Sequence, residues 1–326
     1  MHQRKPYVTE IMSIEVTKLL PADEEGITQA VEILGHGGLV SFPTETVYGL
    51  GADATNDKAV ARIFEAKGRP TFNPLIAHVA SIDMAKDYVE WTPEADKLAS
   101  AFWPGPLSLV LPIKPSSGLS PLVTADLPSL AVRLPAHPLA QQLLERFGKP
   151  IAAPSANPSG KISPTSPNHV MSGLNGKIEA VFDGGTCDVG LESTIVGLID
   201  GPTLFRSGGI PLEALEAALG HKLTEDTSPN TLLAPGQMTS HYAPGAKVRL
   251  NATTWNDGEL RLGFGDFDCD LNLSRAGDLV EAAANLFHHL HALDENDGET
   301  IAVSPIPDHG LGAAINDRLQ RAAAPR

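Results

Sequence analysis

Apolar and polar positions in the first two thirds of the chain alternate between helical and strand-like spacing. Apolar residues from Ile27 to Leu34 recur every three or four positions, which predicts a helix ended by the glycines around 35–38. A second helix runs through Val60 to Lys67 and is capped by Thr55, Asn56 or Asp57. The same patterns predict helices at 93–102, 138–147 and 211–219 and strands at 39–42, 74–80, 107–113, 130–134, 150–153, 180–182, 194–199 and 203–206.

Several of these strands follow one another without an intervening helix. Such a succession requires antiparallel neighbours, so the sheet is expected to be mixed rather than purely parallel. The pattern therefore indicates an α/β fold with a large, twisted mixed sheet and helices packed on it.

Periodicity disappears near His221 and returns at Lys247. The interval is rich in Thr, Ser, Pro, Asn and Gly, which is typical of a linker. Strands at 248–250, 260–264 and 301–304 and helices at 279–293 and 311–323 follow it. We therefore expect a large unit at 13–220, a linker or lid at 221–245 and a small, Rossmann-like α/β unit at 246–326.

Composition narrows the class of protein. With 42% hydrophobic and 19% charged residues among its 326, the chain can build a packed core. A net charge of −15 argues against strong, direct nucleic-acid binding. Two cysteines are too few for a disulfide scaffold or a four-cysteine zinc site, and no run of apolar residues is long enough to span a membrane. These features favour a reducing compartment, and we expect the cytoplasm.

Polar residues gather where predicted strands end. The segment 41–51 places hydroxyls and glycines directly after a strand, and Lys67 and Arg69 are followed closely by Asn73 and His78. A lysine and an arginine so close together suit a polyphosphate, although they also complement a helix C-terminus. No Walker-type phosphate loop occurs in the chain.

Four further segments have the same character, at 129–133, 152–157, 191–196 and 205–209. Each segment alone is as consistent with an ordinary polar loop as with part of a binding site. Together they predict one concave pocket of cations and hydroxyls, without a pair of carboxylates for general acid–base catalysis and without a metal-ligand cluster.

At this point the chain resembles the threonylcarbamoyl-AMP synthase family, the YrdC-type enzymes of tRNA modification, in their two-domain form. The resemblance spans about residues 20–245 in order. It is carried by the motifs Pro-Thr-Glu-Thr-Val-Tyr-Gly-Leu at 43–50, Lys-Gly-Arg-Pro at 67–70, Asn-Pro-Leu-Ile-Ala-His at 73–78, Trp-Pro-Gly-Pro at 103–106, Val-Arg-Leu-Pro at 132–135, Ala-Pro-Ser-Ala-Asn at 153–157, Ser-Thr-Ile-Val at 193–196, Arg-Ser-Gly at 206–208 and the linker signature at 234–244. The acidic C-terminal unit matches only by position and pattern.

The resemblance implies a nucleotidyltransferase that converts L-threonine, bicarbonate or carbon dioxide, and ATP into threonylcarbamoyl-adenylate and pyrophosphate. The product would pass to the machinery that forms N6-threonylcarbamoyladenosine in tRNAs reading ANN codons. Magnesium would accompany the triphosphate, because these side chains cannot neutralise four negative charges alone. The chain shows no dedicated metal site.

The resemblance also assigns roles to residues, with Lys67 and Arg69 as the catalytic pair. L-Threonine would be held by Thr46, His78, Arg133, Ala153 and Ser193. ATP would be surrounded by Lys67, Arg69, Asn73, Ser129, Ser155, Ser163 and Arg206, with Tyr242 of the linker closing over the nucleotide.

Two other sequence features could mark a metal site or reactive thiols. His288, His289 and His291 lie on one predicted helix, but their spacing does not converge on a metal, and a solvated face is the expected reading. Cys187 and Cys269 are expected to be ordinary buried or half-buried residues.

Two alternative functions stay open at the level of sequence. One is a module that binds double-stranded RNA or the ribosome, against which the net charge speaks. The other is the carbamoyl-transfer domain of hydrogenase maturation, which would need cysteine-rich zinc modules that two cysteines cannot supply.

Overall fold

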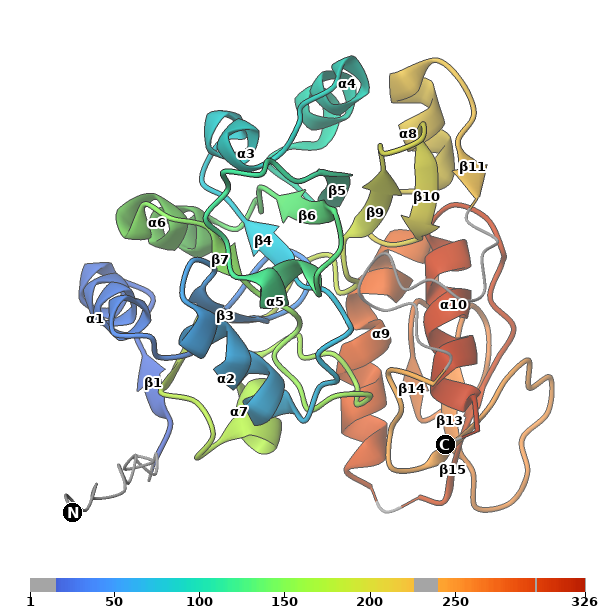
Figure 1. Cartoon of the computed structure of the whole chain (residues 1–326). Coiled ribbons are helices and arrows are strands. Elements are labelled where there is room, and N and C mark those ends of the chain that lie inside the picture. Colours follow the sequence, from blue (N-terminus) through green and yellow to red (C-terminus); the bar gives the residue numbers. More distant parts are fainter. Residues whose placement is uncertain (1–15, 226–239, 297, 326) are drawn as a thin grey trace, which may run out of the picture.

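The computed structural model describes residues 16–225, 240–296 and 298–325, which fold around two sheets (Figure 1). The larger sheet is mixed and the smaller one is parallel, as the sequence predicts. The N-terminal dozen residues and most of the expected linker, including 226–239, lie outside the described residues.

The large sheet has eleven strands in the order β1-β8-β2-β3-β7-β4-β6-β5-β9-β10-β11. Parallel and antiparallel pairs alternate across its middle, where β4 runs parallel to β6 and antiparallel to β7. The strands are β1 (Lys18–Leu20), β2 (Val40–Phe42), β3 (Gly49–Asp53), β4 (Ile76–His78), β5 (Leu107–Pro112), β6 (Ser129–Arg133), β7 (Ile151–Ala152), β8 (Ala180–Phe182), β9 (Thr194–Gly197), β10 (Thr203–Arg206) and β11 (Thr224–Glu225).

Helices of the large unit begin and end where local chemistry predicts. The Asn56 side chain accepts hydrogen bonds from the N–H groups of Lys58 and Ala59, and Gly68 ends the same helix at φ +60°. The helices are α1 (Glu24–Gly35), α2 (Asp57–Lys67), α3 (Ile82–Tyr88), α4 (Pro93–Phe102), α5 (Pro121–Thr124), α6 (Pro138–Phe147), α7 (Pro167–Leu174) and α8 (Leu212–Leu219).

The C-terminal unit is a four-stranded parallel sheet with two long helices. Its strand order is β12-β15-β13-β14. Its elements are β12 (Lys247–Arg249), β13 (Leu260–Gly263), β14 (Leu271–Asn272), α9 (Leu279–Asp294), β15 (Thr300–Val303) and α10 (Leu311–Ala323). In Figure 1, α9 and α10 stand between this small sheet and the large unit. Their apolar faces and residues of the large unit share one buried cluster, which includes Val47, Ile162 and Leu191.

The predicted helices and strands are present, with ends shifted by a few residues. The sequence analysis did not predict β1, β3, β11, β14, α3, α5 or α7 as elements. Strand β3 was hidden because two of its five residues are glycines. Gly51 is required there, since a Cβ would lie 2.8 Å from the Phe42 ring and 2.9 Å from Ile151.

Within the described ranges, no helix has both the length and the apolarity needed to cross a bilayer.

Candidate functional site

A small cavity opens where strand ends of the large sheet meet the last residues of the linker. Its volume is about 50 Å³. It is lined by Thr44, Val47, Gly49, Arg69, Ile76, His78, Arg133, Ala153, Pro154, Ser155, Glu192, Ser193, Arg206, His241 and Tyr242. These residues come from distant segments, which the mixed sheet and the C-terminal unit bring together.

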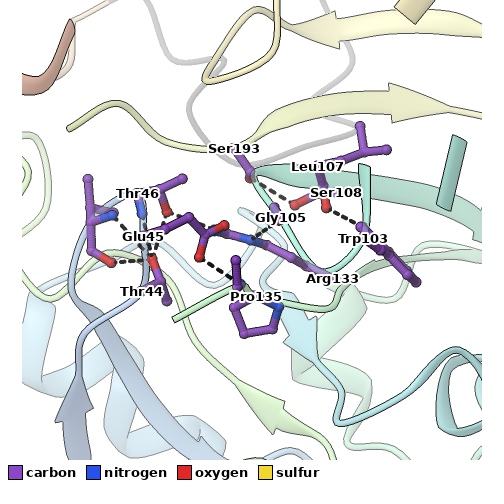
Figure 2. Close-up of polar contacts among 12 residues, drawn as sticks. Thr44, Glu45, Thr46, Trp103, Gly105, Leu107, Ser108, Arg133, Pro135 and Ser193 are labelled. Atoms are coloured by element: carbon purple, nitrogen blue, oxygen red, sulfur yellow. Dashed lines mark hydrogen bonds and ion pairs between the residues drawn. The ribbon is translucent and has the colours of Figure 1, made fainter. Parts of the chain in front are cut away.

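The loop after β2 holds Arg133 of β6 in place (Figure 2). Nη2 of Arg133 donates to Glu45 Oε1 at 2.5 Å, and Nη1 donates to Thr46 Oγ1 at 2.9 Å. Nε donates to the Gly105 carbonyl at 3.3 Å. With three anchored donors and 3% exposure, the guanidinium is pre-oriented and still reaches the cavity.

His78 lies at the end of β4 and is a neutral imidazole at physiological pH. Burial, and then the nearby Arg133 charge, lower the pKa of His78 to about 3. Its ring stands edge-on to Phe42 at 5.9 Å, and Nδ1 is buried without a hydrogen-bond partner among the described residues. His78 therefore presents an uncharged ring to the cavity.

Ser193 and Arg206 form a second anchored pair. The Ser193 and Ser108 hydroxyls are 2.8 Å apart (Figure 2), and Nη2 of Arg206 donates to the Ser193 carbonyl at 2.7 Å. Both residues line the cavity. Because β9 and β10 are antiparallel neighbours, the pair is fixed by the sheet.

Lys67 is the last residue of helix α2 and Arg69 follows its C-cap, Gly68; both side chains are buried, at 4% and 8% exposure. Lys67 Nζ donates to the carbonyls of Ser155 and Asn157, and Arg69 Nη2 donates to the Pro74 carbonyl at 2.9 Å. In the described part of the chain, neither side chain forms an ion pair with a carboxylate. Burial lowers both pKa values, that of Arg69 to about 10. Buried cations held only by carbonyls favour an anionic ligand.

An arginine of the C-terminal unit contacts the cavity wall from behind. Arg318 of α10 is 1% exposed, and its Nε donates to Glu192 Oε2 at 2.9 Å while Nη2 donates to the Ser207 carbonyl at 2.8 Å. The other oxygen of Glu192 accepts from Ser163 Oγ at 2.5 Å. Arg318 and Arg206 help to keep the pKa of Glu192 below its usual value despite burial. Glu192 is therefore an ionised, fully engaged carboxylate at the cavity wall.

Tyr242 and His241 cover the cavity. Tyr242 is 1% exposed, stacks with Phe287 of α9 at 5.6 Å between ring centroids, and has the Arg318 guanidinium 5.2 Å from its ring centre. The Ala243 N–H donates to the Gly160 carbonyl at 2.9 Å. Burial lowers the pKa of His241 to about 3. The last residues of the linker are thus clamped between the two units.

Comparison with known proteins fits this architecture. A family model described as telomere recombination matches residues 32–208, and a model described as the C-terminal domain of threonylcarbamoyl-AMP synthase matches residues 210–324. The chain is 41% identical to threonylcarbamoyl-AMP synthase of Bacillus subtilis, over 96% of this chain and 97% of that protein. It is 43% identical to the Pyrococcus abyssi enzyme of the same name, over 93% and 96%.

The chain belongs to the threonylcarbamoyl-AMP synthase family. The crystal structure of P. abyssi Sua5 complexed with L-threonine superimposes with a TM-score of 0.87 at 39% identity, covering 94% of this chain and 98% of that one. The similarity therefore includes the C-terminal unit, which the sequence motifs alone matched only by position.

The sequence analysis predicted thirteen site residues for a member of this family, and most reach the cavity wall. The lining includes Arg69, His78, Arg133, Ala153, Ser155, Ser193, Arg206 and Tyr242. Thr46 and Ser163 do not line the cavity but are hydrogen-bonded to residues that do, Thr46 to Arg133 and Ser163 to Glu192. Lys67 contacts the backbone of the lining residue Ser155. Asn73 and Ser129 are buried but do not line the cavity.

Four ionisable residues of this site are not among the predicted ones, namely Glu45, Glu192, His241 and Arg318. The predicted pocket had no pair of carboxylates, whereas Glu192 lines the cavity and Glu45 lies behind Arg133. Both are ion-paired with arginines, so neither is a free general base. The sequence signal was a glutamate inside the motif at 43–50 and another directly before the motif at 193–196. Nothing in the periodic face of α10 marks Arg318 as a partner of Glu192.

Among residues 16–225, 240–296 and 298–325, no group of three or more His, Cys, Asp or Glu side chains could hold a metal ion.

Proposed function

We propose that this enzyme joins L-threonine, bicarbonate or carbon dioxide, and ATP into threonylcarbamoyl-adenylate, releasing pyrophosphate. The observation that carries this proposal is a pair of buried cations, Arg69 in the cavity wall and Lys67 directly behind Ser155, which carbonyls and no carboxylate hold among the described residues. Such a pair suits a triphosphate at one end of the cavity. The L-threonine complex of the P. abyssi relative supports threonine as the amino acid.

On the nucleotide side, Lys67 and Arg69 neutralise the charge that develops as pyrophosphate leaves. Arg206 lies at the end of β10 beside Ser193 and would extend the same cationic wall. We assign Asn73, Ser129, Ser155 and Ser163 to the shell around ATP. Ser155 is the best placed of these, because it lines the cavity and its carbonyl accepts a hydrogen bond from Lys67.

On the amino-acid side, Arg133 is the natural partner for the threonine carboxylate. Glu45 and Thr46 fix the guanidinium, so little conformational entropy is lost when the carboxylate binds. The neutral ring of His78, the backbone near Ala153 and the hydroxyl of Ser193 complete a slot for the side chain and amino group.

The chemistry requires positioning and dryness more than a covalent protein group. Threonine nitrogen first forms a carbamate, whose oxygen then bonds to the α-phosphorus as the bond to pyrophosphate breaks. The carbamate is unstable in water, so exclusion of solvent protects it. No serine or cysteine nucleophile is needed.

The cavity is small for a nucleotide, because its volume of about 50 Å³ lies below the roughly 300–1,000 Å³ of typical ligand sites. Tyr242 and His241 are the side chains that the linker contributes to its wall. We therefore assign residues 240–245 to a lid that moves away for substrate entry and product release.

Three further assignments complete the proposal. Mg²⁺ would arrive with ATP and be held by its phosphates, because the carboxylates at the cavity, Glu45 and Glu192, are already bound to arginines. The adenylate would pass to the tRNA threonylcarbamoyl-transferase machinery. We expect the reaction in the cytoplasm, where ATP is supplied and the unpaired Cys187 and Cys269 stay reduced.

The deciding assay measures ATP consumption and pyrophosphate release with L-threonine and bicarbonate, each omitted in turn. We expect stoichiometric pyrophosphate and a threonine-containing adenylate only when all three are present. Pyrophosphate release that is independent of threonine would refute the proposal. An RNA-binding role would instead appear as a salt-dependent RNA shift at low protein concentration.

A further inference from the structure

Four histidines lie along the contact between the large unit and the C-terminal unit. His169 is on α7, and His288, His289 and His291 are on α9; we call them the histidine seam (Figure 1 shows the two helices). The rings of His169 and His291 are stacked, with centroids 3.9 Å apart and planes 18° apart, and His288 is 5.7 Å from His169. The expectation of a solvated face for the three α9 histidines is therefore wrong for His291.

Hydrogen bonds fix the neutral form of the stacked pair. Nδ1 of His169 accepts from the backbone N–H of Thr165 at 3.3 Å, so this nitrogen carries no proton. Nε2 of His291 lies 3.2 Å from the Ser163 carbonyl, which can only accept, so this nitrogen carries the proton. Protonating His169 would point its new N–H at the Thr165 N–H and remove that bond, which leaves only the 3.4 Å contact with the Thr165 hydroxyl at this nitrogen.

The surroundings offer His169 no compensating anion. Helix α7 carries no charged side chain, and neither does the segment 163–165. On α9, the Asp294 and Glu295 carboxylates favour the protonated form of His291, and His288 and His289 are its histidine neighbours on the helix. The next carboxylate beyond Ser163, that of Glu192, accepts a hydrogen bond from Arg318. Burial, and then His291 and His288, lower the pKa of His169 to about 3, and burial lowers the pKa values of His291 and His289.

The seam is joined to the lid on both sides. Ser163, which bonds to His291, donates its hydroxyl to Glu192 of the cavity wall. Phe287, beside His288 on α9, stacks with Tyr242. Displacing α9 from α7 would therefore remove the support of Tyr242 and leave the Ser163 segment without its partner.

We propose that the histidine seam is a proton-sensitive latch, in which protonation of His169 and His291 in mildly acidic solution releases α9 from α7 and loosens Tyr242 over the cavity. The effect on catalysis rests on the proposed lid; the release of α9 does not. Since the docked state favours neutral rings, docking is complete above the ordinary histidine pKa of about 6.5 and weakens as the pH falls toward the lowered values. Lowering the pH from about 7.5 to about 5.5 favours release about tenfold through His169 alone, and the lowered pKa of His291 acts in the same direction.

The test is backbone hydrogen exchange in α7 and α9 of the full chain at about pH 7.5 and about pH 5.5, corrected for intrinsic rates. His169→Asn keeps an acceptor near the Nδ1 position, and His169→Phe keeps the stacked ring; neither can be protonated. His309→Phe, at an exposed histidine outside the seam, is the matched control.

We expect corrected exchange in both helices to rise about tenfold or more at the lower pH in wild type and the control, and to rise much less in both His169 variants. Strands β5 and β6 should not respond. An unchanged wild type, or variants that keep the full rise, would overturn the latch. If both variants already exchange rapidly at the higher pH, the test is the wild-type protein alone. A rise in corrected exchange at the lower pH in α7 and α9 but not in β5 and β6 would then support the latch, and an equal change in all four would overturn it. This readout is independent of turnover, so the latch and the proposed reaction can fail separately.

Discussion

At the residue scale, the proposed chemistry depends on two buried cations, Lys67 at the end of α2 and Arg69 just after it. Lys67 and Arg69 lie away from water and are held by carbonyl oxygens, which are neutral partners. A site that keeps buried charge without an ion pair is arranged for an incoming anion.

Replacing either cation should therefore impair turnover more than folding. We expect Lys67→Ala or Arg69→Ala to lose about 2–4 kcal/mol of transition-state stabilisation, or about a hundredfold or more in kcat/KM for ATP. Lys58→Ala, an exposed lysine on the same helix, is the control and should stay near wild type. Wild-type rates from a folded double variant of Lys67 and Arg69 would contradict their assignment to the triphosphate.

We also expect selectivity for threonine to depend on single side chains, namely Thr46, His78 and Ser193. One methyl group in a fitted slot contributes only about 1–3 kcal/mol, so L-serine should be a poor but detectable substrate. Specificity constants measured for both amino acids test this. Equal constants would mean that no such slot exists.

At the element scale, the end of the linker is held by aromatic and cationic contacts. Tyr242 is stacked with Phe287 and lies against Arg318. Tyr242→Ala should raise KM for ATP and lower kcat, because the cavity stays wet, whereas Tyr242→Phe keeps the ring and should retain most activity. ATP titrations of both variants, with threonine binding measured beside them, separate the two effects. An alanine variant with unchanged ATP kinetics would contradict the lid.

Helix α10 contributes through the buried Arg318–Glu192 ion pair. Removing Arg318 leaves the Glu192 carboxylate buried without an ion pair among the described residues, so Arg318→Gln should lower the free energy of unfolding by about 3–5 kcal/mol. Glu192→Gln should lower it less, because Arg318 keeps a second ion pair with Asp317. The double variant should cost less than the sum of the two. Arg249→Gln, which breaks a more exposed pair in the same unit, should change little. Additive losses in denaturant titrations would show that the pair is not coupled.

At the scale of the whole molecule, the question is what the C-terminal unit does for catalysis. We propose the division into 13–220, 221–245 and 246–326, and chains ending at 220 and at 245 test it. The first should fold and bind threonine but turn over poorly, because it lacks Tyr242. The second keeps Tyr242 but loses Phe287 and Arg318, so the structure predicts that it is also impaired.

Both truncated chains are compared with full-length protein in the pyrophosphate assay, with circular dichroism confirming that each is folded. If the chain ending at 220 matches full-length turnover, the lid is wrong. If the chain ending at 245 is fully active, the clamp on Tyr242 is dispensable, and the C-terminal unit serves partner recognition or stability instead.

Sequence by itself determined the elements whose signal is local. The spacing of Val60, Ile63 and Phe64 and the cap at Asn56 define α2, because periodic burial and capping act within one or two turns. The motifs at strand ends also identified most of the cavity lining, since the ends of neighbouring strands meet at one edge of a sheet.

Tertiary structure alone decided which distant residues are partners. Glu45 and Arg133 are 88 positions apart, and Glu192 and Arg318 are 126 apart. Such pairs leave no periodic trace, because their distance depends on how the sheet and the C-terminal unit pack rather than on local spacing. The same holds for His169 and His291, whose stacking required two helices from different units to meet, and for the contacts of Tyr242 with Phe287 and Arg318.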